Sequence, residues 1–185
     1  MIKKGDSCIM EPEDYHALRG QLNPVYQVIA DVLLNTGMRI EEFWYLVEHP
    51  EIYSQRRRCI SLPQEAIKKA KTCYPERDVL LTSSGCETIE TMQKLNLKRV
   101  SRTAMNDAFK LAARKANLSM WEKFSPKVFR KTTVSWLIKA VPEKLPAITN
   151  SQGHDWNTIN RHYYGVAFSK ESVVKIKMFF DGWGE

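Results

Sequence analysis

Between residues 125 and 132 the chain reads Ser-Pro-Lys-Val-Phe-Arg-Lys-Thr, and this stretch predicts the start of a helix. Ser125 is a typical N-cap, and Pro126 suits the first helical position because an amide hydrogen is not needed there. A stripe at helical spacing then continues through Thr133, Trp136, Leu137 and Ala140, before Pro142. We therefore expect an amphipathic helix with one buried face and with Arg130 near its beginning.

Similar patterns on both sides predict a mainly α chain with a small antiparallel β-sheet. Helices are predicted at residues 11–18, 24–36 and 41–47, and again at 145–151 and 170–180. The stripe of Met105, Ala108, Phe109 and Ala112 predicts one more, closed near Asn117. Two strand-like stretches, 59–62 and 78–82, flank a basic hairpin tip at 68–77.

Composition limits the classes of protein that fit. The 185 residues carry 28 Lys and Arg against 21 Asp and Glu, for a formal charge of +7, which favours a polyanionic partner. With 43% hydrophobic residues the chain can bury a core, unlike a disordered basic tail. No apolar run approaches the roughly 18–20 residues of a membrane span. The four cysteines are Cys8, Cys59, Cys73 and Cys86. They are scattered without metal-ligand spacing, so we expect a cytoplasmic protein with reduced thiols and no metal or cofactor.

Three separated motifs point to one family. Residues 36–42 read Thr-Gly-Met-Arg-Ile-Glu-Glu, residues 125–132 contain Pro-Lys-x-x-Arg-Lys-Thr, and Gly153-His154 is followed nine residues after the histidine by Tyr163. In this order the motifs resemble those of the catalytic domain of tyrosine recombinases, the phage-integrase and Xer family. The resemblance extends from about Glu11 to Val166 and implies the fold of that catalytic domain.

The resemblance also implies a role for each matching residue. Arg39 and Arg130 would hold the scissile phosphate, His154 would donate a hydrogen bond to it, and Tyr163 would be the nucleophile. The family's hairpin lysine, a general acid for the leaving oxygen, matches Lys71 best. Lys69, two residues earlier in the same predicted hairpin, is the alternative.

Lys127 departs from the usual pattern, in which a histidine precedes the arginine by three residues. This variant is similar to integrases of spindle-shaped archaeal viruses and related archaeal plasmids. An unperturbed lysine is protonated near neutral pH, so a general base at this position is in doubt. We expect Lys127 to act as a catalytic hydrogen-bond donor to the phosphate or to the phenolate of Tyr163.

The chemistry is consistent with these residue types. Guanidinium groups grip phosphate oxygens in pairs and stay charged. A tyrosine hydroxyl becomes nucleophilic when cationic neighbours stabilise its phenolate. The resemblance implies a covalent 3′-phosphotyrosine product, which would conserve bond energy for religation without a nucleotide cofactor. No carboxylate pair suited to holding a divalent metal accompanies these residues, which disfavours a two-metal nuclease mechanism.

Other readings of single residues remain open. Tyr164 competes with Tyr163 as the nucleophile, although the spacing from His154 favours Tyr163. The basic residues assigned to DNA binding are Arg56, Arg57, Arg58, Lys69 and Lys131. For several of them the alternative is a solvated surface without a DNA contact.

Residues 1–10 are expected to be an N-terminal extension or linker, 11–168 the catalytic domain, and 169–185 a C-terminal helix and tail. In the tail, Val173, Ile176 and Phe180 fall at helical spacing and require a groove on this domain or on a neighbour. Family members commonly carry a separate N-terminal DNA-clamping domain, so we expect a fragment with low affinity for DNA.

The expected partner is double-stranded DNA at attachment sites, bound by a chain that is a monomer alone and a tetramer in the synaptic complex. If the chain is viral, the compartment would be the host cytoplasm. The alternatives are a type IB topoisomerase, a DNA-binding relative without catalysis, and a basic helical transcription regulator.

Overall fold

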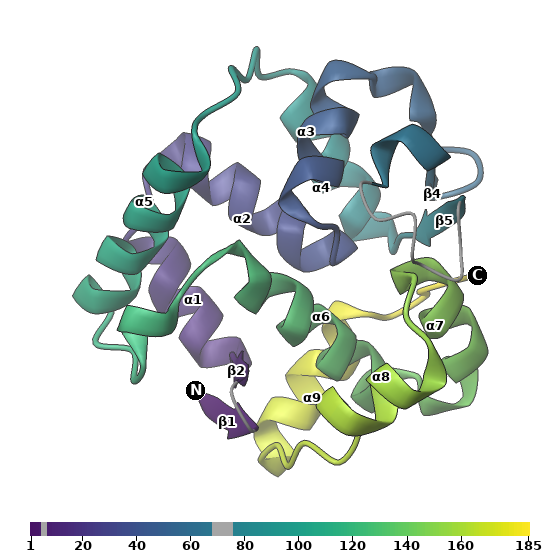
Figure 1. Cartoon of the computed structure of the whole chain (residues 1–185). Coiled ribbons are helices and arrows are strands. Elements are labelled where there is room, and N and C mark those ends of the chain that lie inside the picture. Colours follow the sequence, from purple (N-terminus) through teal and green to yellow (C-terminus); the bar gives the residue numbers. More distant parts are fainter. Residues whose placement is uncertain (5–6, 68–75) are drawn as a thin grey trace.

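The computed structural model describes residues 1–4, 7–67 and 76–185 and is mainly helical, with two small antiparallel sheets (Figure 1). The first helices are α1 (Pro12–Gly20), α2 (Pro24–Thr36), α3 (Ile40–Glu48) and α4 (Ser83–Gln93). The later ones are α5 (Arg102–Lys115), α6 (Pro126–Ala140), α7 (Leu145–Gln152), α8 (Trp156–His162) and α9 (Lys170–Phe179). The strands are β1 (Ile2–Lys4), β2 (Ser7–Ile9), β3 (Tyr53–Ser54), β4 (Cys59–Leu62) and β5 (Arg77–Leu80). The predicted fold class is therefore confirmed.

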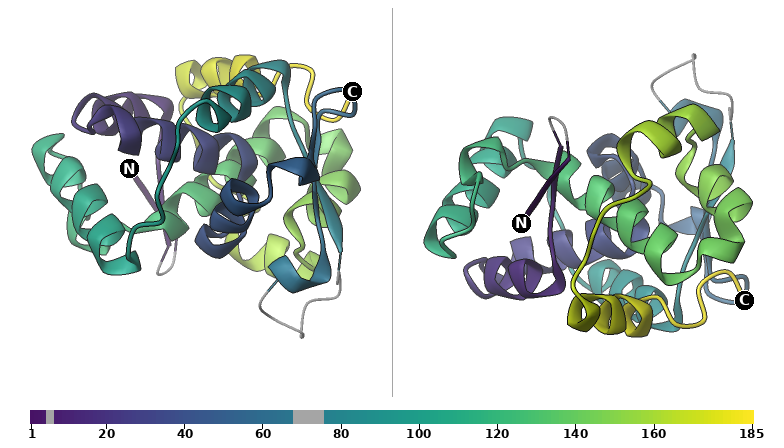
Figure 2. Two further views of the ribbon diagram at one scale, coloured as in Figure 1. Left: turned by 90° about the horizontal axis from the view of Figure 1, so that it is seen from above. Right: turned by 90° about the horizontal axis from the view of Figure 1, so that it is seen from below.

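Helix α6 lies in the middle of the fold, with α5 on one side and the three-stranded sheet on the other (Figures 1 and 2). It contacts α2, α7, α9 and β2. The sequence predicted one buried face for α6, but burial extends further around the helix. Thr132, Thr133 and Ser135 are buried along with the apolar residues. Their polar groups are partly used by the surrounding backbone: Thr133 Oγ1 donates to Leu34 O at 2.7 Å, and Thr132 Oγ1 accepts from Met10 N at 3.0 Å. Ser125 is the N-cap by position but makes no capping hydrogen bond with its side chain.

Local capping signals set the ends of α2. The side chain of Asn23 accepts from Tyr26 N at 3.0 Å, and Pro24 occupies the first turn. Gly37 ends the helix in the left-handed region, at φ 63°. The left-handed turn favours glycine, and a Cβ atom at this position would also lie 2.5 Å from Gln152 Oε1 and displace that side chain.

The larger sheet has the order β3-β4-β5, with Ile60 opposite Val79. Strand β5 ends at Leu80, two residues before the predicted end, because Thr82 instead caps α4 by accepting from Gly85 N at 3.0 Å. Helices α4 and α8 and strand β3 were not predicted from the sequence.

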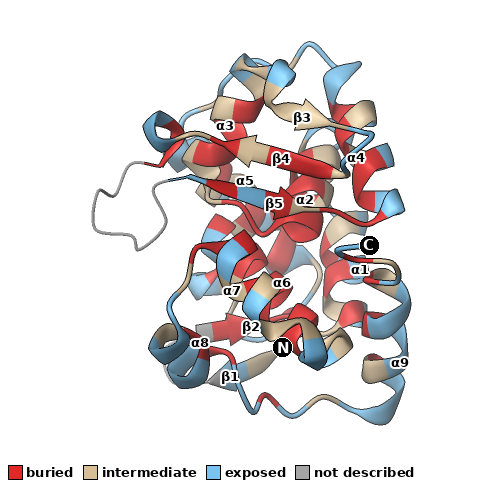
Figure 3. Cartoon of the chain, turned by 90° about the vertical axis from the view of Figure 1, so that its right-hand side faces the viewer, coloured by how far each residue is buried: buried red, intermediate tan, exposed pale blue. Residues whose placement is uncertain are grey.

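Both ends of the described chain pack onto the core. Residues 1–10 were expected to be an extension or linker. In the described part of this stretch β1 pairs with β2, and Met10 O accepts from the indole of Trp136 at 2.8 Å. Ile9 and Met10 are fully buried, so this stretch belongs to the core (Figure 3).

At the other end, α9 packs on α6 and α1 of its own chain. Ile176 and Phe180 are buried there, so the groove that this apolar stripe requires is on its own domain. The tail then returns to the sheet, where Trp183 Nε1 donates to Leu80 O at 3.0 Å.

Among the helices of the described residues, none is both long and apolar enough to cross a membrane.

Candidate active site

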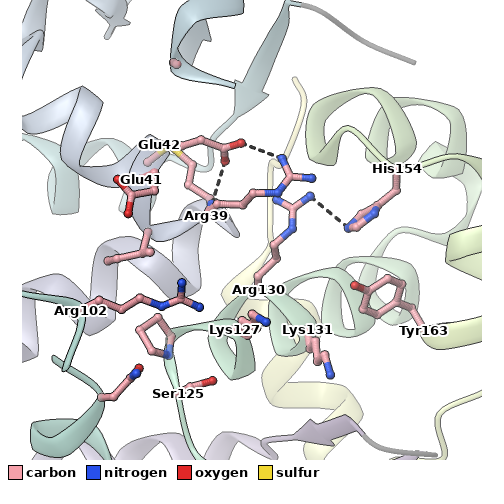
Figure 4. Close-up of a pocket in the computed structure, with 15 residues that line it drawn as sticks. Arg39, Glu41, Glu42, Arg102, Ser125, Lys127, Arg130, Lys131, His154 and Tyr163 are labelled. Carbon is pink, nitrogen blue, oxygen red and sulfur yellow. Dashed lines mark hydrogen bonds and ion pairs between the residues drawn. The ribbon is translucent and has the colours of Figure 1, made fainter. Parts of the chain in front are cut away.

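Five residues that the sequence assigned to catalysis surround one pocket of about 550 Å³. They are Arg39, Lys127, Arg130, His154 and Tyr163. They come from the start of α3, the first turns of α6, the turn after α7 and the end of α8 (Figure 4). Side chains separated by more than a hundred residues thus face one space, and most of them are cationic or aromatic.

Arg39 is placed by the turn that ends α2. Thr36 Oγ1 donates to Val32 O at 2.7 Å and accepts from Met38 N at 3.2 Å, which fixes the chain on both sides of Gly37. Arg39 is then the N-cap of α3, and its NH1 donates to Glu42 Oε1 at 2.7 Å. The Thr-Gly pair therefore directs the arginine that follows it into the pocket.

Arg130 is buried against backbone acceptors. Its NH1 donates to Gly37 O at 2.7 Å, and its NH2 donates to Gln152 O and, at 3.1 Å, to His154 Nε2. Burial and the nearby charge of Arg39 lower the pKa of Arg130 to about 9. The guanidinium stays charged at neutral pH and links α2, α6 and α7 at the back of the pocket.

His154 accepts from a donor at Nε2, so its hydrogen must be on Nδ1 in the neutral ring. Burial, followed by the charges of Arg130 and Arg39, lowers the pKa of His154 to about 2. At neutral pH the imidazole is therefore neutral, with Nδ1–H as its donor. A bound anion would raise this pKa by opposing the arginine charges.

This pKa predicts a loss of stability at acidic pH. An unfolded histidine binds a proton near pH 6.5, so between about pH 6.5 and 2 the unfolded chain binds more protons than the folded one. Stability should therefore fall as the pH falls through this window, by up to about 1.4 kcal/mol per pH unit. Urea unfolding at about pH 7 and about pH 5 measures the difference.

His154→Gln keeps an acceptor for Arg130 but cannot titrate, and its stability should depend less on pH. His16→Gln, at an exposed position of α1, is the control and should behave as the parent does. If the stability of His154→Gln depends on pH as that of the parent does, the pH dependence does not arise from His154.

Tyr163 lies beside His154, with ring centroids 5.2 Å apart, and is 7% exposed. Burial raises its pKa, while Arg130 and Arg39 act in the opposite direction, so the hydroxyl is protonated at neutral pH. Tyr164 is 50% exposed, faces Trp156 and does not line the pocket. The geometry favours Tyr163 of the two candidate nucleophiles.

The remaining sequence candidates are divided. Lys131 lines the pocket beside Lys127. Arg56, Arg57 and Arg58 do not line it: they lie at the β3–β4 turn, whereas the pocket is near the opposite end of β4. Arg58 there donates to Ser83 Oγ and to Glu185 O. Lys69 and Lys71 are outside the described residues, so the hairpin lysine remains a prediction.

Some residues of the site were missed. Glu42 was only part of a quoted motif, yet it is 1% exposed among Arg39, Arg77 and Arg130. Burial alone would raise the pKa of Glu42, but the three arginines together lower it. Arg102 and Asn106 of α5 also line the pocket. A sequence signal for Arg102 was its position just after Ser101, which caps α5.

Three guanidinium groups around one carboxylate leave positive charge in excess, as suits a phosphate anion. Within the part of the chain that the structure describes, no group of three or more His, Cys, Asp or Glu residues is placed to hold a metal ion.

The fold is similar to that of XerA recombinase in its crystal structure, with a TM-score of 0.63 and 13% sequence identity. The match covers 96% of this chain and 65% of the XerA chain, so this chain spans about two thirds of that protein's length. No family model and no curated protein matches the sequence. At this identity the likeness shows the fold, and it agrees with the catalytic-domain fold predicted from the motifs.

Proposed function

We propose that this chain is the catalytic domain of a site-specific DNA recombinase that cuts and rejoins duplex DNA through a 3′-phosphotyrosine intermediate. The observation that carries the proposal is the meeting of Arg39, Arg130, His154 and Tyr163 around one positively charged pocket. The similarity of the fold to XerA recombinase supports the same class of reaction.

In this proposal the scissile phosphate binds between the two arginines. Arg39 donates to the phosphate from the start of α3. Arg130 and His154 exchange part of the hydrogen bonding between them for hydrogen bonds to its non-bridging oxygens. Nδ1–H of His154 and the ammonium of Lys127 are further donors. Donors fixed in this way stabilise the charge that develops on these oxygens as the phosphorus becomes five-coordinate.

The covalent step exchanges one phosphate ester for another. Tyr163 Oη gives its proton to water and forms a bond to phosphorus, while the bond from phosphorus to the 5′-oxygen breaks. Lys71, or Lys69 in its place, supplies the proton that the 5′-oxygen takes up. The products are a 3′-phosphotyrosine and a free 5′-hydroxyl, and the reverse reaction with another 5′-hydroxyl rejoins the strand.

The partner in this proposal is double-stranded DNA, with Lys131 and Arg102 near the strand being cut and Arg56, Arg57 and Arg58 at a separate contact. The chain would be a monomer alone and would form a tetramer on paired sites in the cytoplasm. The Lys127 variant further suggests the integrases of spindle-shaped archaeal viruses and plasmids, a subgroup supported by that residue alone.

A nicked duplex tests the proposal, because loss of a short 5′ fragment traps the covalent intermediate. We expect a protein–DNA adduct that survives denaturing electrophoresis and forms equally well in excess chelator, since Arg39, Arg130 and Lys71 supply the positive charge. Phosphodiester cleavage without a covalent adduct, or a strict requirement for a divalent metal, would contradict the mechanism. Recombination between two sites, measured beside relaxation of supercoils, separates a recombinase from a type IB topoisomerase.

A further inference from the structure

Arg77, the first residue of β5, forms a buried ion pair with Glu42 behind the pocket. Its NH2 donates to Glu42 Oε2 at 2.7 Å, and the two side chains are 3% and 2% exposed. Arg77 does not line the pocket, so it has no direct path to a bound phosphate. Its effect on the site must pass through its neighbours.

The carboxylate of Glu42 is shared between Arg77 and Arg39. Oε1 accepts from Arg39 NH1 at 2.7 Å, while Oε2 accepts from Arg77 NH2 and from the backbone N of Arg39, each at 2.7 Å. Arg77 therefore fixes the group that orients Arg39.

Arg77 also touches the turn that carries His154. Its Nε donates to Ser151 O at 3.0 Å, in the last turn of α7. Gly153 follows at φ 58°, and a Cβ atom there would be 3.2 Å from Arg77 Cδ, so the arginine packs directly on this turn. The amide of Leu80 donates to Ser151 Oγ at 3.0 Å, a second link between β5 and α7.

Competition for Arg39 follows from this arrangement. Glu42 attracts Arg39 toward the back of the pocket, whereas a phosphate attracts it toward the front. With Arg77 present, the charge of Glu42 is shared with a second close cation, so its hold on Arg39 is weaker. Without Arg77, the carboxylate would attract Arg39 more strongly and the pocket would lose positive potential.

We propose that Arg77 is a positioning residue for the cleavage reaction: it sets Arg39 through Glu42 and the His154 turn through Ser151. This inference rests on the proposed function. It assigns a role to β5, because this strand fixes the arginine at the N-cap of α3 and the histidine after α7.

The test compares Arg77→Gln with the parent on two nicked duplexes. One has an ordinary scissile phosphate, and the other has a methylphosphonate, in which a methyl group replaces one charged oxygen. On the ordinary duplex we expect Arg77→Gln to form the adduct about 10²-fold more slowly, as for other displaced catalytic groups. The methylphosphonate is uncharged, so the attraction between Arg39 and negative charge contributes little to cleavage. On this duplex Arg77→Gln and the parent should react at nearly equal rates.

Arg19→Gln is the matched control, because it breaks an arginine–carboxylate pair with Asp31 away from the pocket. It should react as the parent does on both duplexes. Thermal unfolding of each protein measures the cost to stability separately.

A purely structural role would slow Arg77→Gln by the same factor on both substrates, and that result would overturn the inference, as would an unchanged rate on the ordinary duplex. If Arg77→Gln does not fold, Arg77→Met carries the same comparison, since methionine also removes the cation beside Glu42 and the donor to Ser151 O. A parent protein that forms no adduct would overturn the proposed function and this inference with it. A parent that cleaves while the Arg77 variants cleave equally fast would overturn the inference alone.

Discussion

Tyr163→Phe should abolish the covalent adduct with DNA and leave the affinity for the same duplex nearly unchanged. The substitution removes one oxygen atom, the proposed nucleophile, and leaves the ring that packs 5.2 Å from His154. No other change in the site removes an atom of the new covalent bond, so the expected loss is complete. Denaturing electrophoresis measures the adduct, and a mobility shift on the nicked duplex measures binding.

Tyr164→Phe is the matched control, since it removes the same atom from the adjacent residue. Tyr164 is half exposed and faces Trp156 outside the pocket, so this variant should form the adduct at the parent's rate. An adduct that persists in Tyr163→Phe would transfer the nucleophile's role to Tyr164 or to another tyrosine.

Features that depend on neighbouring residues could be predicted from the sequence. Helix α2 begins at Asn23-Pro24 and ends at Gly37 as expected, because an N-cap, a proline and a left-handed glycine act through local backbone chemistry. The same local chemistry places Arg39 two residues after that glycine, at the N-cap of α3. The three motifs therefore contain most of the residues that line the pocket.

Features that depend on distant residues could not be predicted. Helix α4 begins with polar residues after β5, and its capping by Thr82 is easily mistaken for the end of the strand. The two-sided burial of α6 depends on the β1–β2 hairpin and on α9, which come from the two ends of the described chain. The expectation of an extension or linker at residues 1–10 did not anticipate this packing, for the same reason.

The arginine cluster shows how this limit affects the site. Glu42 and Arg77 are 35 residues apart, and Arg130 and Gln152 are 22 apart. Neither pair belongs to a short motif, yet both decide where the predicted residues point. Sequence motifs indicated the groups that we propose to touch DNA, whereas the tertiary structure shows the groups that hold them.

The second large effect is expected for Arg130→Lys, which should slow adduct formation by roughly 10²–10³-fold, as for loss of a fixed oxyanion donor. One ammonium cannot replace a guanidinium that donates to Gly37 O, to Gln152 O and to His154. Arg114→Lys on the exposed side of α5 is the control and should react as the parent does.

The pH dependence of Arg130→Lys makes this prediction specific. Burial and Arg39 lower the pKa of Arg130 to about 9, and the guanidinium still keeps its proton at neutral pH. The ordinary pKa of lysine is lower, near 10.4. The same surroundings should therefore bring the pKa of a lysine at position 130 close to neutral pH. The ammonium would then lose its proton as the pH rises through the neutral range, so the deficit of the variant relative to the parent should grow with increasing pH. Single-turnover adduct formation from mildly acidic to mildly alkaline pH measures the ratio of the parent's rate to the variant's rate. A ratio that stays constant would show that the loss arises from the shape of the side chain alone. The charge of residue 130 would then not be what the reaction requires.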